Sequence, residues 1–231
     1  MGRGKLIVIE GIDSSGKATQ VKLIFQELLK RNYRVMKLEF PDYKSDSSAL
    51  IKMYLNGKFG EDPQLVNPYA ASLFFAADRF ASYKICWEKF YSENGIIISD
   101  RYVSSNMIYQ AAKFDNKDER QKYLNWVYDL EFCRLNLPEP DIVIFLCMPP
   151  QFSMKLASNR PNKITGLQEK DIHERNAKYM EKTYDVAMEV AKRYKWGILD
   201  CIKNDAVKPE KEINKELLKI IEKKLKGAVK F

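Results

Sequence analysis

Histidine is nearly absent from this 231-residue sequence, which has only His173, and cysteine is scarce. The four cysteines, Cys86, Cys133, Cys147 and Cys201, show no C-x-x-C spacing, so we expect neither a zinc site nor a disulfide framework. Free cysteines are usually buried apolar residues, and His173, in a charged stretch, is predicted to be solvent-exposed. His173 is the one candidate for a histidine general acid or base, which favours catalysis by charge and positioning.

Long hydrophobic runs are also lacking. The run IVIFLCM at 142–148 is far shorter than the roughly 20 residues of a membrane helix, and MGRGKLIVIEG turns polar too early for a signal peptide. We therefore expect a cytoplasmic protein with no membrane partner. Basic runs interleaved with aromatic residues are missing too, so the net charge of +8 suggests small phosphate-bearing partners and no nucleic acid. Much of that charge lies at 223–231, where a solvated helix face is the alternative.

Short β-branched runs alternate with segments of helical periodicity along the chain. Five of these runs have the length of a strand and are largely apolar, at 5–10, 33–40, 95–100, 141–147 and 196–202. Runs of this kind suit strands that are buried on both faces of a parallel sheet. The sequence therefore predicts an α/β fold with a five-stranded parallel sheet flanked by helices. No repeat or linker divides the chain, so we expect a single domain over 1–231.

One segment differs from the rest in composition. Residues 158–174, SNRPNKITGLQEKDIHE, are polar, basic and interrupted by Pro161 and Gly166. We interpret approximately 158–172 as a short lid over a ligand, and an ordinary exposed loop is the alternative.

The sequence IEGIDSSGKATQ at 9–20 contains a candidate phosphate-binding loop. Gly11, Gly16 and Lys17 fit the pattern G-x-x-x-x-G-K between a predicted strand and a predicted helix. Backbone N–H groups and the positive helix N-terminus bind phosphate in such loops, and the lysine reaches the outer phosphates. A glycine-rich turn that binds nothing is the alternative. The predicted ATP-binding residues are Gly11, Ile12, Asp13, Ser14, Ser15, Gly16, Lys17, Ala18 and Thr19.

Ala18 stands where these loops usually carry a hydroxyl that coordinates Mg²⁺. Thr19 cannot replace it, because one residue along a helix rotates the side chain by about 100°. A water held by a carboxylate can take the hydroxyl's place. Asp100 ends the strand at 95–100 and should lie beside the loop at the carboxyl edge of the sheet. We predict that Asp100 holds Mg²⁺, directly or through a water, with ATP as co-substrate.

The class of nucleotide-binding protein follows from what accompanies the loop. A GTP switch carries N-K-x-D, and Asn116-Lys117-Asp118 has the wrong spacing. ATP-driven motors are generally larger and carry additional modules. Phosphoryl transfer between two small molecules, under a lid that excludes water, suits a chain of this size.

Six segments, taken in order, resemble the thymidylate kinases, a family of P-loop nucleoside monophosphate kinases. They are IEGIDSSGKATQ, FPDY at 40–43, LFFAADRF at 73–80, DRYVSSNMIYQ at 100–110, PEPDIVIFL at 138–146, and the lid with DIHE at 171–174. The resemblance implies a P-loop NTPase fold, ATP-dependent phosphorylation of thymidine monophosphate (dTMP) to thymidine diphosphate in nucleotide biosynthesis, and a homodimer. Two alternatives stay open: a kinase for another (deoxy)nucleoside monophosphate, and a non-catalytic nucleotide-binding regulator.

The resemblance also assigns an acceptor site. Phe75 and Arg79 lie four residues apart on one predicted helix face, from which they would contact thymine; a core phenylalanine beside a surface arginine is the alternative. By resemblance, Arg101 contacts the acceptor phosphate, Asp13 the 3′-hydroxyl, and Tyr102 crowds the 2′ position. The complete predicted set is Asp13, Phe40, Phe75, Arg79, Arg101, Tyr102, Ser105, Tyr109 and Gln110.

Catalysis is expected from Lys17, Arg101 and Arg160. Phosphoryl transfer depends on alignment and on charge neutralisation, and a lid guanidinium such as that of Arg160 binds two phosphate oxygens at once. Lys163 and Lys170 are weaker candidates for the same role.

The sequence departs from the family at two further positions. Ser14 stands where some members carry an arginine, and Glu39 stands ahead of Phe-Pro where many do. Glu39 leaves more of the binding of the acceptor phosphate to Arg101 and Arg79, and Ser14 leaves the transition-state cation to the lid.

Overall fold

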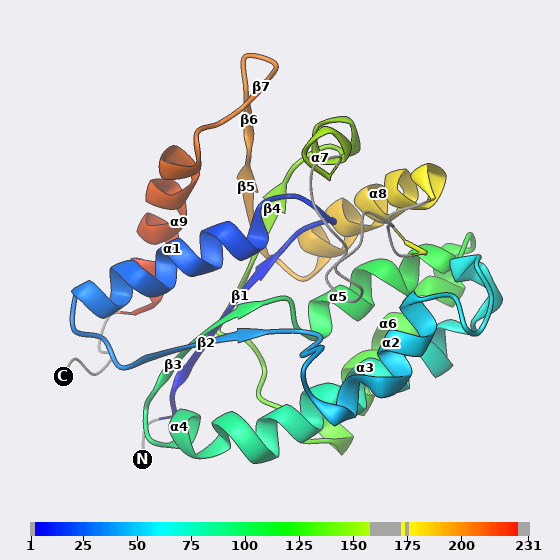
Figure 1. Ribbon diagram of the computed structural model, residues 1–231, viewed down its shortest axis with the longest axis horizontal. Coiled ribbons are helices and arrows are strands. Elements are labelled where there is room, and N and C mark those ends of the chain that lie inside the picture. The colour runs from blue at the N-terminus through cyan, green and yellow to red at the C-terminus, as the bar shows by residue number, and fades with distance from the viewer. Residues whose placement is uncertain (1–2, 158–171, 174–175, 226–231) are drawn as a thin grey trace.

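The computed structural model describes residues 3–157, 172–173 and 176–225 (Figure 1). Its central sheet is parallel, with strand order β2-β3-β1-β4-β5. The strands are β1 (Lys5–Glu10), β2 (Val35–Glu39), β3 (Ile96–Asp100), β4 (Ile142–Cys147) and β5 (Gly197–Asp200), and a hairpin of β6 (Ile202–Lys203) and β7 (Ala206–Val207) follows. All five predicted strands are present within two residues of their predicted ends, so the predicted α/β fold is confirmed.

Helices connect the strands and cover both faces of the sheet. They are α1 (Lys17–Lys30), α2 (Ala49–Leu55), α3 (Pro68–Ser82), α4 (Glu88–Ser92), α5 (Val103–Tyr109), α6 (Lys117–Tyr128), α7 (Pro150–Ala157), α8 (Ala177–Arg193) and α9 (Glu210–Lys224). A π-helical turn at Tyr83–Trp87 joins α3 to α4, and a second at Asp129–Arg134 follows α6. Among the described residues, no helix is long and apolar enough to cross a membrane.

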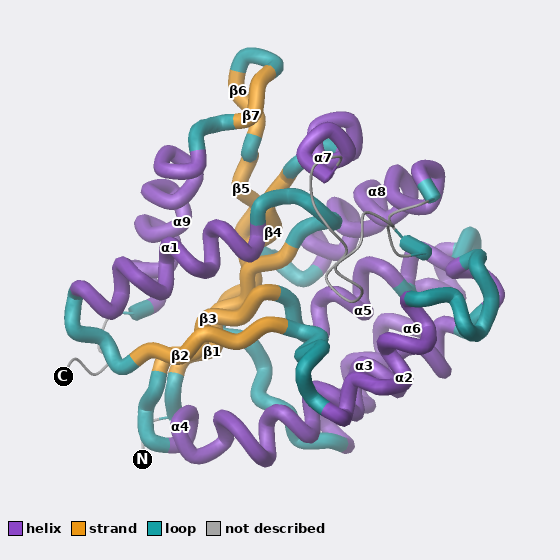
Figure 2. Tube along the Cα trace, in the orientation of Figure 1, coloured by secondary structure: helices purple, strands orange, loops and turns teal. Residues whose placement is uncertain are grey.

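Successive side chains of β1 are buried on opposite faces of the sheet. Leu6 and Val8 belong to the core formed with α5, α6 and α8, whereas Ile7 and Ile9 belong to the core formed with α1 and α9. Figure 2 shows these two groups of helices on either side of the sheet. Burial on both faces explains why the strand sequences are apolar nearly throughout instead of alternating.

The order of the strands positions the functional site. β1 pairs with β3 on one side and with β4 on the other, so the loop that follows β1 emerges between two neighbouring strand ends. Ile9 is in register with Asp100, the last residue of β3. Ligands of open α/β sheets bind at such a point, outside the carboxyl ends of the strands.

The cysteine prediction is wrong for two of the four residues. Cys201 is buried and Cys147 is half-buried, but Cys86 and Cys133 are exposed. Both exposed residues lie in the π-helical turns, on the side that faces away from the cores.

Candidate active site

The loop at 11–16, between β1 and α1, has the local structure of an anion-binding turn. Gly16 has φ 88°, in the left-handed region that favours glycine. At Gly11 a Cβ would lie 2.4 Å from Ser15 Oγ, so a larger residue would displace the Ser15 hydroxyl from its place in the loop. Helix α1 begins at Lys17 and has no acidic residue in its first turn, which leaves its positive end available for phosphate.

Lys17 lies inside this loop and not on its surface. The side chain is 6% exposed, and Nζ donates to the carbonyl oxygens of Gly11 (2.9 Å) and Ile12 (2.7 Å). An ammonium has three N–H donors, so one is left for a phosphate oxygen. Burial lowers the pKa of Lys17 to about 8, with the nearby Arg101 acting in the same direction.

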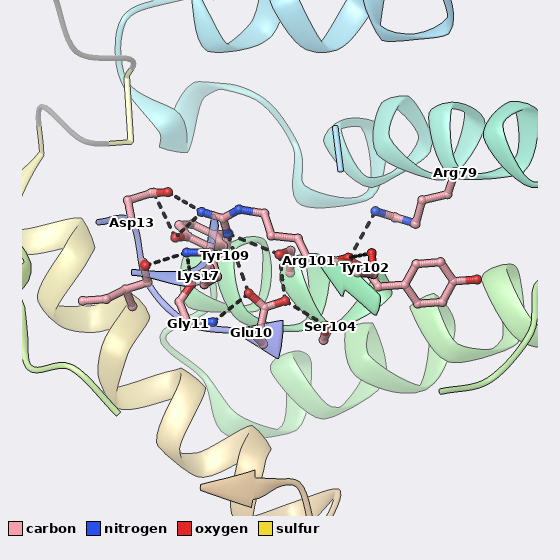
Figure 3. Close-up of polar contacts among 12 residues, drawn as sticks. Glu10, Gly11, Asp13, Lys17, Arg79, Arg101, Tyr102, Ser104 and Tyr109 are labelled. Atoms are coloured by element: carbon pink, nitrogen blue, oxygen red, sulfur yellow. Dashed lines mark hydrogen bonds and ion pairs between the residues drawn. The ribbon is translucent and has the colours of Figure 1, made fainter. Parts of the chain in front are cut away.

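Arg101 lies between the loop and α5 in an uncommon backbone conformation. Its φ is 69°, and the backbone is fixed by two hydrogen bonds: Arg101 N donates to Ile9 O (3.1 Å) and Ser99 Oγ donates to Arg101 O (2.6 Å). The guanidinium pairs with Asp13, and Nη1 lies 3.7 Å from Glu10 Oε1 (Figure 3). The fold thus places one guanidinium between two carboxylates beside the phosphate loop.

Sequence reasoning did not single out Glu10. This carboxylate is fully buried at the end of β1, where Oε1 accepts from Gly11 N (3.0 Å) and Oε2 accepts from the hydroxyls of Ser104 and Ser105 (2.8 Å each). Glu10 therefore joins the phosphate loop, α5 and Arg101. The available signal was a charged residue that ends an otherwise apolar strand next to a glycine.

Asp13 is held in its ionised form. Its carboxylate accepts from Tyr109 Oη (2.9 Å) and pairs with Arg101. Burial alone would raise the pKa of Asp13, but the charges of Arg101 and Lys17 and the hydrogen bond from Tyr109 outweigh burial and hold the pKa well below its usual range. Asp13 therefore acts only as a hydrogen-bond acceptor.

A pocket next to these charges is lined by all nine residues that were predicted for the acceptor. It also contains Asn106 and His173, which sequence reasoning had not assigned to a ligand. The nine residues come from the segments that follow β1, β2 and β3, from α3, and from α5 and its C-terminal end. The fold thus brings together positions up to 97 residues apart in the chain. Their roles in binding stay predictions.

Arg79, which lines the pocket, belongs to a buried ion pair. Arg79 is 2% exposed and Glu131 is fully buried; Arg79 Nε donates to Glu131 Oε2 (2.8 Å), and Nη2 pairs with Oε1. Nη1 lies 3.5 Å from Tyr102 O. The alternative of a surface arginine is therefore wrong, because the π-helical turn after α6 supplies Arg79 with a buried counterion.

Tyr102 extends away from the cluster of Asp13, Glu10 and Arg101 (Figure 3). Its ring is fully buried and packs against Phe40, with ring centroids 5.7 Å apart. Its proposed contact with the 2′ position stays a prediction.

Asp100 has the surroundings expected of a residue that helps to hold a cation. It is 3% exposed, and Oδ1 has no hydrogen-bond partner among the residues that the structure describes. The hydroxyls of Ser14 and Ser15 in the loop are likewise buried and without partners in the described part of the chain. No group of three or more His, Cys, Asp or Glu side chains suited to a metal occurs in that part. One carboxylate plus waters and phosphate oxygens fits Mg²⁺, which retains several waters in such sites.

Most of the predicted lid, with Arg160, Lys163 and Lys170, lies outside the described residues. Of its predicted span only Ile172 is described; it is 1% exposed and donates its N–H to Leu55 O (3.3 Å) in α2. His173 follows and is 5% exposed, so the prediction of a solvated histidine is wrong. The charged sequence around His173 is typical of an exposed segment and gave no sign that Ile172 and His173 pack against α2.

Comparisons with known proteins agree with this geometry. The family model described as thymidylate kinase matches residues 9–216. The thymidylate kinase of Mycobacterium tuberculosis is 31% identical over 83% of this chain and 87% of its own length, and the probable thymidylate kinase of Pyrococcus horikoshii is 33% identical over 74% and 80%. A solved structure of the thymidylate kinase of Candida albicans, described with a broad substrate specificity, superposes with a TM-score of 0.69 and 26% identity over 96% of this chain and 92% of that chain.

Proposed function

The chain belongs to the thymidylate kinase family, and on that basis we propose that it transfers the γ-phosphoryl group of ATP to dTMP, giving thymidine diphosphate and ADP. The observation that carries this proposal is the pocket in which all nine expected acceptor residues meet the phosphate loop at Asp13 and Arg101. The two substrates would thereby approach each other beside the guanidinium of Arg101.

In this proposal the donor phosphates lie in the loop at 11–16, with the loop N–H groups and Lys17 on their oxygens. Mg²⁺, held through Asp100 and waters, would supply further neutralisation of the phosphate charge. Arg101 and the lid residue Arg160 would stabilise the charge that develops on the transferred group. No general base of matched pKa is required, because phosphoryl transfer is driven by alignment and electrostatics.

The acceptor would lie along the pocket with its base toward Arg79 and its phosphate toward Arg101. Phe40 and Phe75 offer aromatic surface to a pyrimidine. Gln110 Oε1 is buried and has no partner among the described residues, so it is an acceptor for a base N–H. Asp13, ionised in this environment, would accept the hydrogen of a sugar hydroxyl.

We test the proposal by measuring ADP and diphosphate formation from ATP and Mg²⁺ with dTMP, dUMP, UMP, dCMP, AMP and GMP at matched concentrations. We expect a strong preference for dTMP. Because the Candida albicans relative is described with a broad specificity, activity on another acceptor would reassign the substrate within the same class. Binding of the nucleotides without turnover would instead favour the regulator. Arg160→Ala tests the lid assignment: unchanged turnover would contradict it.

We also propose a single-domain homodimer in the cytoplasm. Leu73 and Phe80, two turns apart on α3, are 49% and 39% exposed, and Ile85 in the following π-helical turn is 81% exposed. This apolar strip suits a contact with a second copy of the chain. The exposed thiols of Cys86 and Cys133 suit the reducing environment of the cytoplasm. Light scattering of the purified protein and of Leu73→Asp measures the assembly: a monomeric wild-type protein would contradict the dimer.

A further inference from the structure

Three buried polar side chains from separate parts of the chain lie in a row beside the acceptor pocket. Lys113 Nζ donates to Val66 O (2.8 Å) and to the hydroxyl of Tyr54 (3.1 Å). The same hydroxyl lies 2.9 Å from Nε2 of His173. Tyr54 is fully buried in α2, and His173 is 5% exposed where the chain returns from the predicted lid. The row thus links the turn after α5 to α2 and to His173.

A shared hydroxyl group ties His173 to Lys113. Lys113 Nζ donates to the Tyr54 oxygen, and a hydrogen bond joins the same oxygen to Nε2 of His173. Burial lowers the pKa of His173 to about 3, outweighing the charge of Asp13, and the charges of Lys113 and Arg101 lower it further. His173 is therefore a neutral ring at physiological pH.

The ring of His173 supports a residue that touches the phosphate loop. It stacks on Tyr109 with centroids 5.5 Å apart and an interplanar angle of 14°. Tyr109 donates its hydroxyl proton to Asp13 Oδ2 (2.9 Å), and Arg101 Nη2 donates to the same hydroxyl (3.4 Å). The backbone of Tyr109 is fixed separately, because Tyr179 Oη donates to Tyr109 O (2.5 Å). The backbone bond leaves the ring orientation to its packing partners.

We propose that His173 is a positioning residue of the acceptor site: held by Tyr54 and Lys113, its neutral ring fixes Tyr109 and thereby the Asp13 carboxylate that receives the acceptor. This inference rests on the proposed function. It assigns a role to the only histidine of the chain, a role that consists of orientation and not of proton transfer. Loss of the ring would release the Tyr109 side chain and weaken acceptor binding more than ATP binding.

Three variants separate the ring from its hydrogen bond. His173→Phe keeps a ring against Tyr109, His173→Gln keeps an acceptor for the Tyr54 hydroxyl, and His173→Ala removes both. We expect His173→Ala and His173→Gln to raise KM for dTMP about tenfold, as displaced positioning groups do, with KM for ATP within about twofold. His173→Phe should retain most of the affinity. Tyr184→Phe is the matched control. It removes a hydroxyl of α8 that contacts Cys147 Sγ, and it should change neither KM.

The outcomes distinguish this inference from the proposed function. If the wild-type protein turns over no nucleoside monophosphate, the proposed function fails; if it prefers another acceptor, the same series is measured with that acceptor. The positioning role would be overturned if His173→Ala left KM for the acceptor unchanged. It would also be overturned if His173→Phe and His173→Ala each raised KM for the acceptor and KM for ATP by the same factor. Calorimetric binding of dTMP without ATP provides a second readout, and should the alanine variant fail to fold, the Phe and Gln variants alone decide the question.

Discussion

The buried pair of Arg79 and Glu131 allows a quantitative prediction. Glu131→Ala removes the counterion of a guanidinium that is 2% exposed. Removing one partner of a buried ion pair costs about 3 to 5 kcal/mol, because the remaining charge is left uncompensated. We therefore expect the free energy of unfolding to fall by about 4 kcal/mol, a large share of the roughly 5 to 15 kcal/mol of a typical domain.

A matched double variant separates the cost of the unpaired charge from the value of the pair. Arg79→Met with Glu131→Leu fills the same space with apolar side chains, and such replacements are commonly neutral or stabilising. We expect its unfolding free energy to lie within about 1 kcal/mol of the wild type, or above it. The same double variant should bind dTMP weakly, because Arg79 lines the pocket that we propose for the acceptor.

Urea unfolding followed by circular dichroism, with linear extrapolation to water, measures all three proteins. Glu131→Gln provides an intermediate case, since it keeps one acceptor oxygen but no charge. The reasoning is refuted if Glu131→Ala loses less than about 1 kcal/mol, or if the double variant is as unstable as Glu131→Ala. The first result would mean that the guanidinium is hydrated or finds another partner, and the second that the apolar side chains do not fill the space of the ion pair.

Three further perturbations follow from the site. His173 has a pKa of about 3 in the fold, against 6.5 ordinarily. Between these two values the unfolded chain binds one more proton than the folded chain, so the free energy of unfolding falls with falling pH by up to about 1.4 kcal/mol per unit. His173→Gln should lose this pH dependence in urea unfolding at pH 4 to 7, and parallel plots of unfolding free energy against pH for the two proteins would contradict the burial argument. Ala18→Thr restores a hydroxyl ligand and should lower the Mg²⁺ concentration for half-maximal activity several-fold, whereas an unchanged Mg²⁺ titration would mean that the hydroxyl does not reach the ion. Glu10→Gln keeps the shape and one acceptor oxygen, but it turns the other oxygen into an NH2 donor and removes the charge beside Arg101. Unfolding should therefore become easier by about 1 to 3 kcal/mol, and equal stability would show that the carboxylate contributes only shape.

The sequence was sufficient for the fold and for the phosphate loop because both depend on local patterns. A strand buried on both faces is apolar throughout, and the loop needs Gly11, Gly16 and Lys17 within seven residues. By contrast, Glu131 is 52 residues from Arg79 and His173 is 119 residues from Tyr54. Propensity and spacing carry no information on such pairs, because only the packed helices bring them together.

The acceptor residues are an intermediate case. The resemblance named nine positions that the fold does collect in one pocket, but it gave no sign that Arg79 has two of its nitrogen atoms bonded to Glu131. Asn106 lines the same pocket and was missed, because an asparagine inside a helical pattern gives no signal of its own.

If the acceptor phosphate binds Arg101 as proposed, the two carboxylates beside this guanidinium make binding an exchange of its counterions. Glu10 is fully enclosed and keeps its place, whereas Asp13 is partly accessible and can give up its share of the guanidinium to a dianionic phosphate. Because Asp13 stays in the site as a carboxylate, binding would add both negative charges of the phosphate, and affinity should fall as ionic strength rises. Tyr109 would keep its hydrogen bond to Asp13 Oδ2, and Oδ1 would become free to accept from a sugar hydroxyl of the same molecule. Inorganic phosphate has no sugar hydroxyl, so we expect the exchange to select for nucleotides over the free anion.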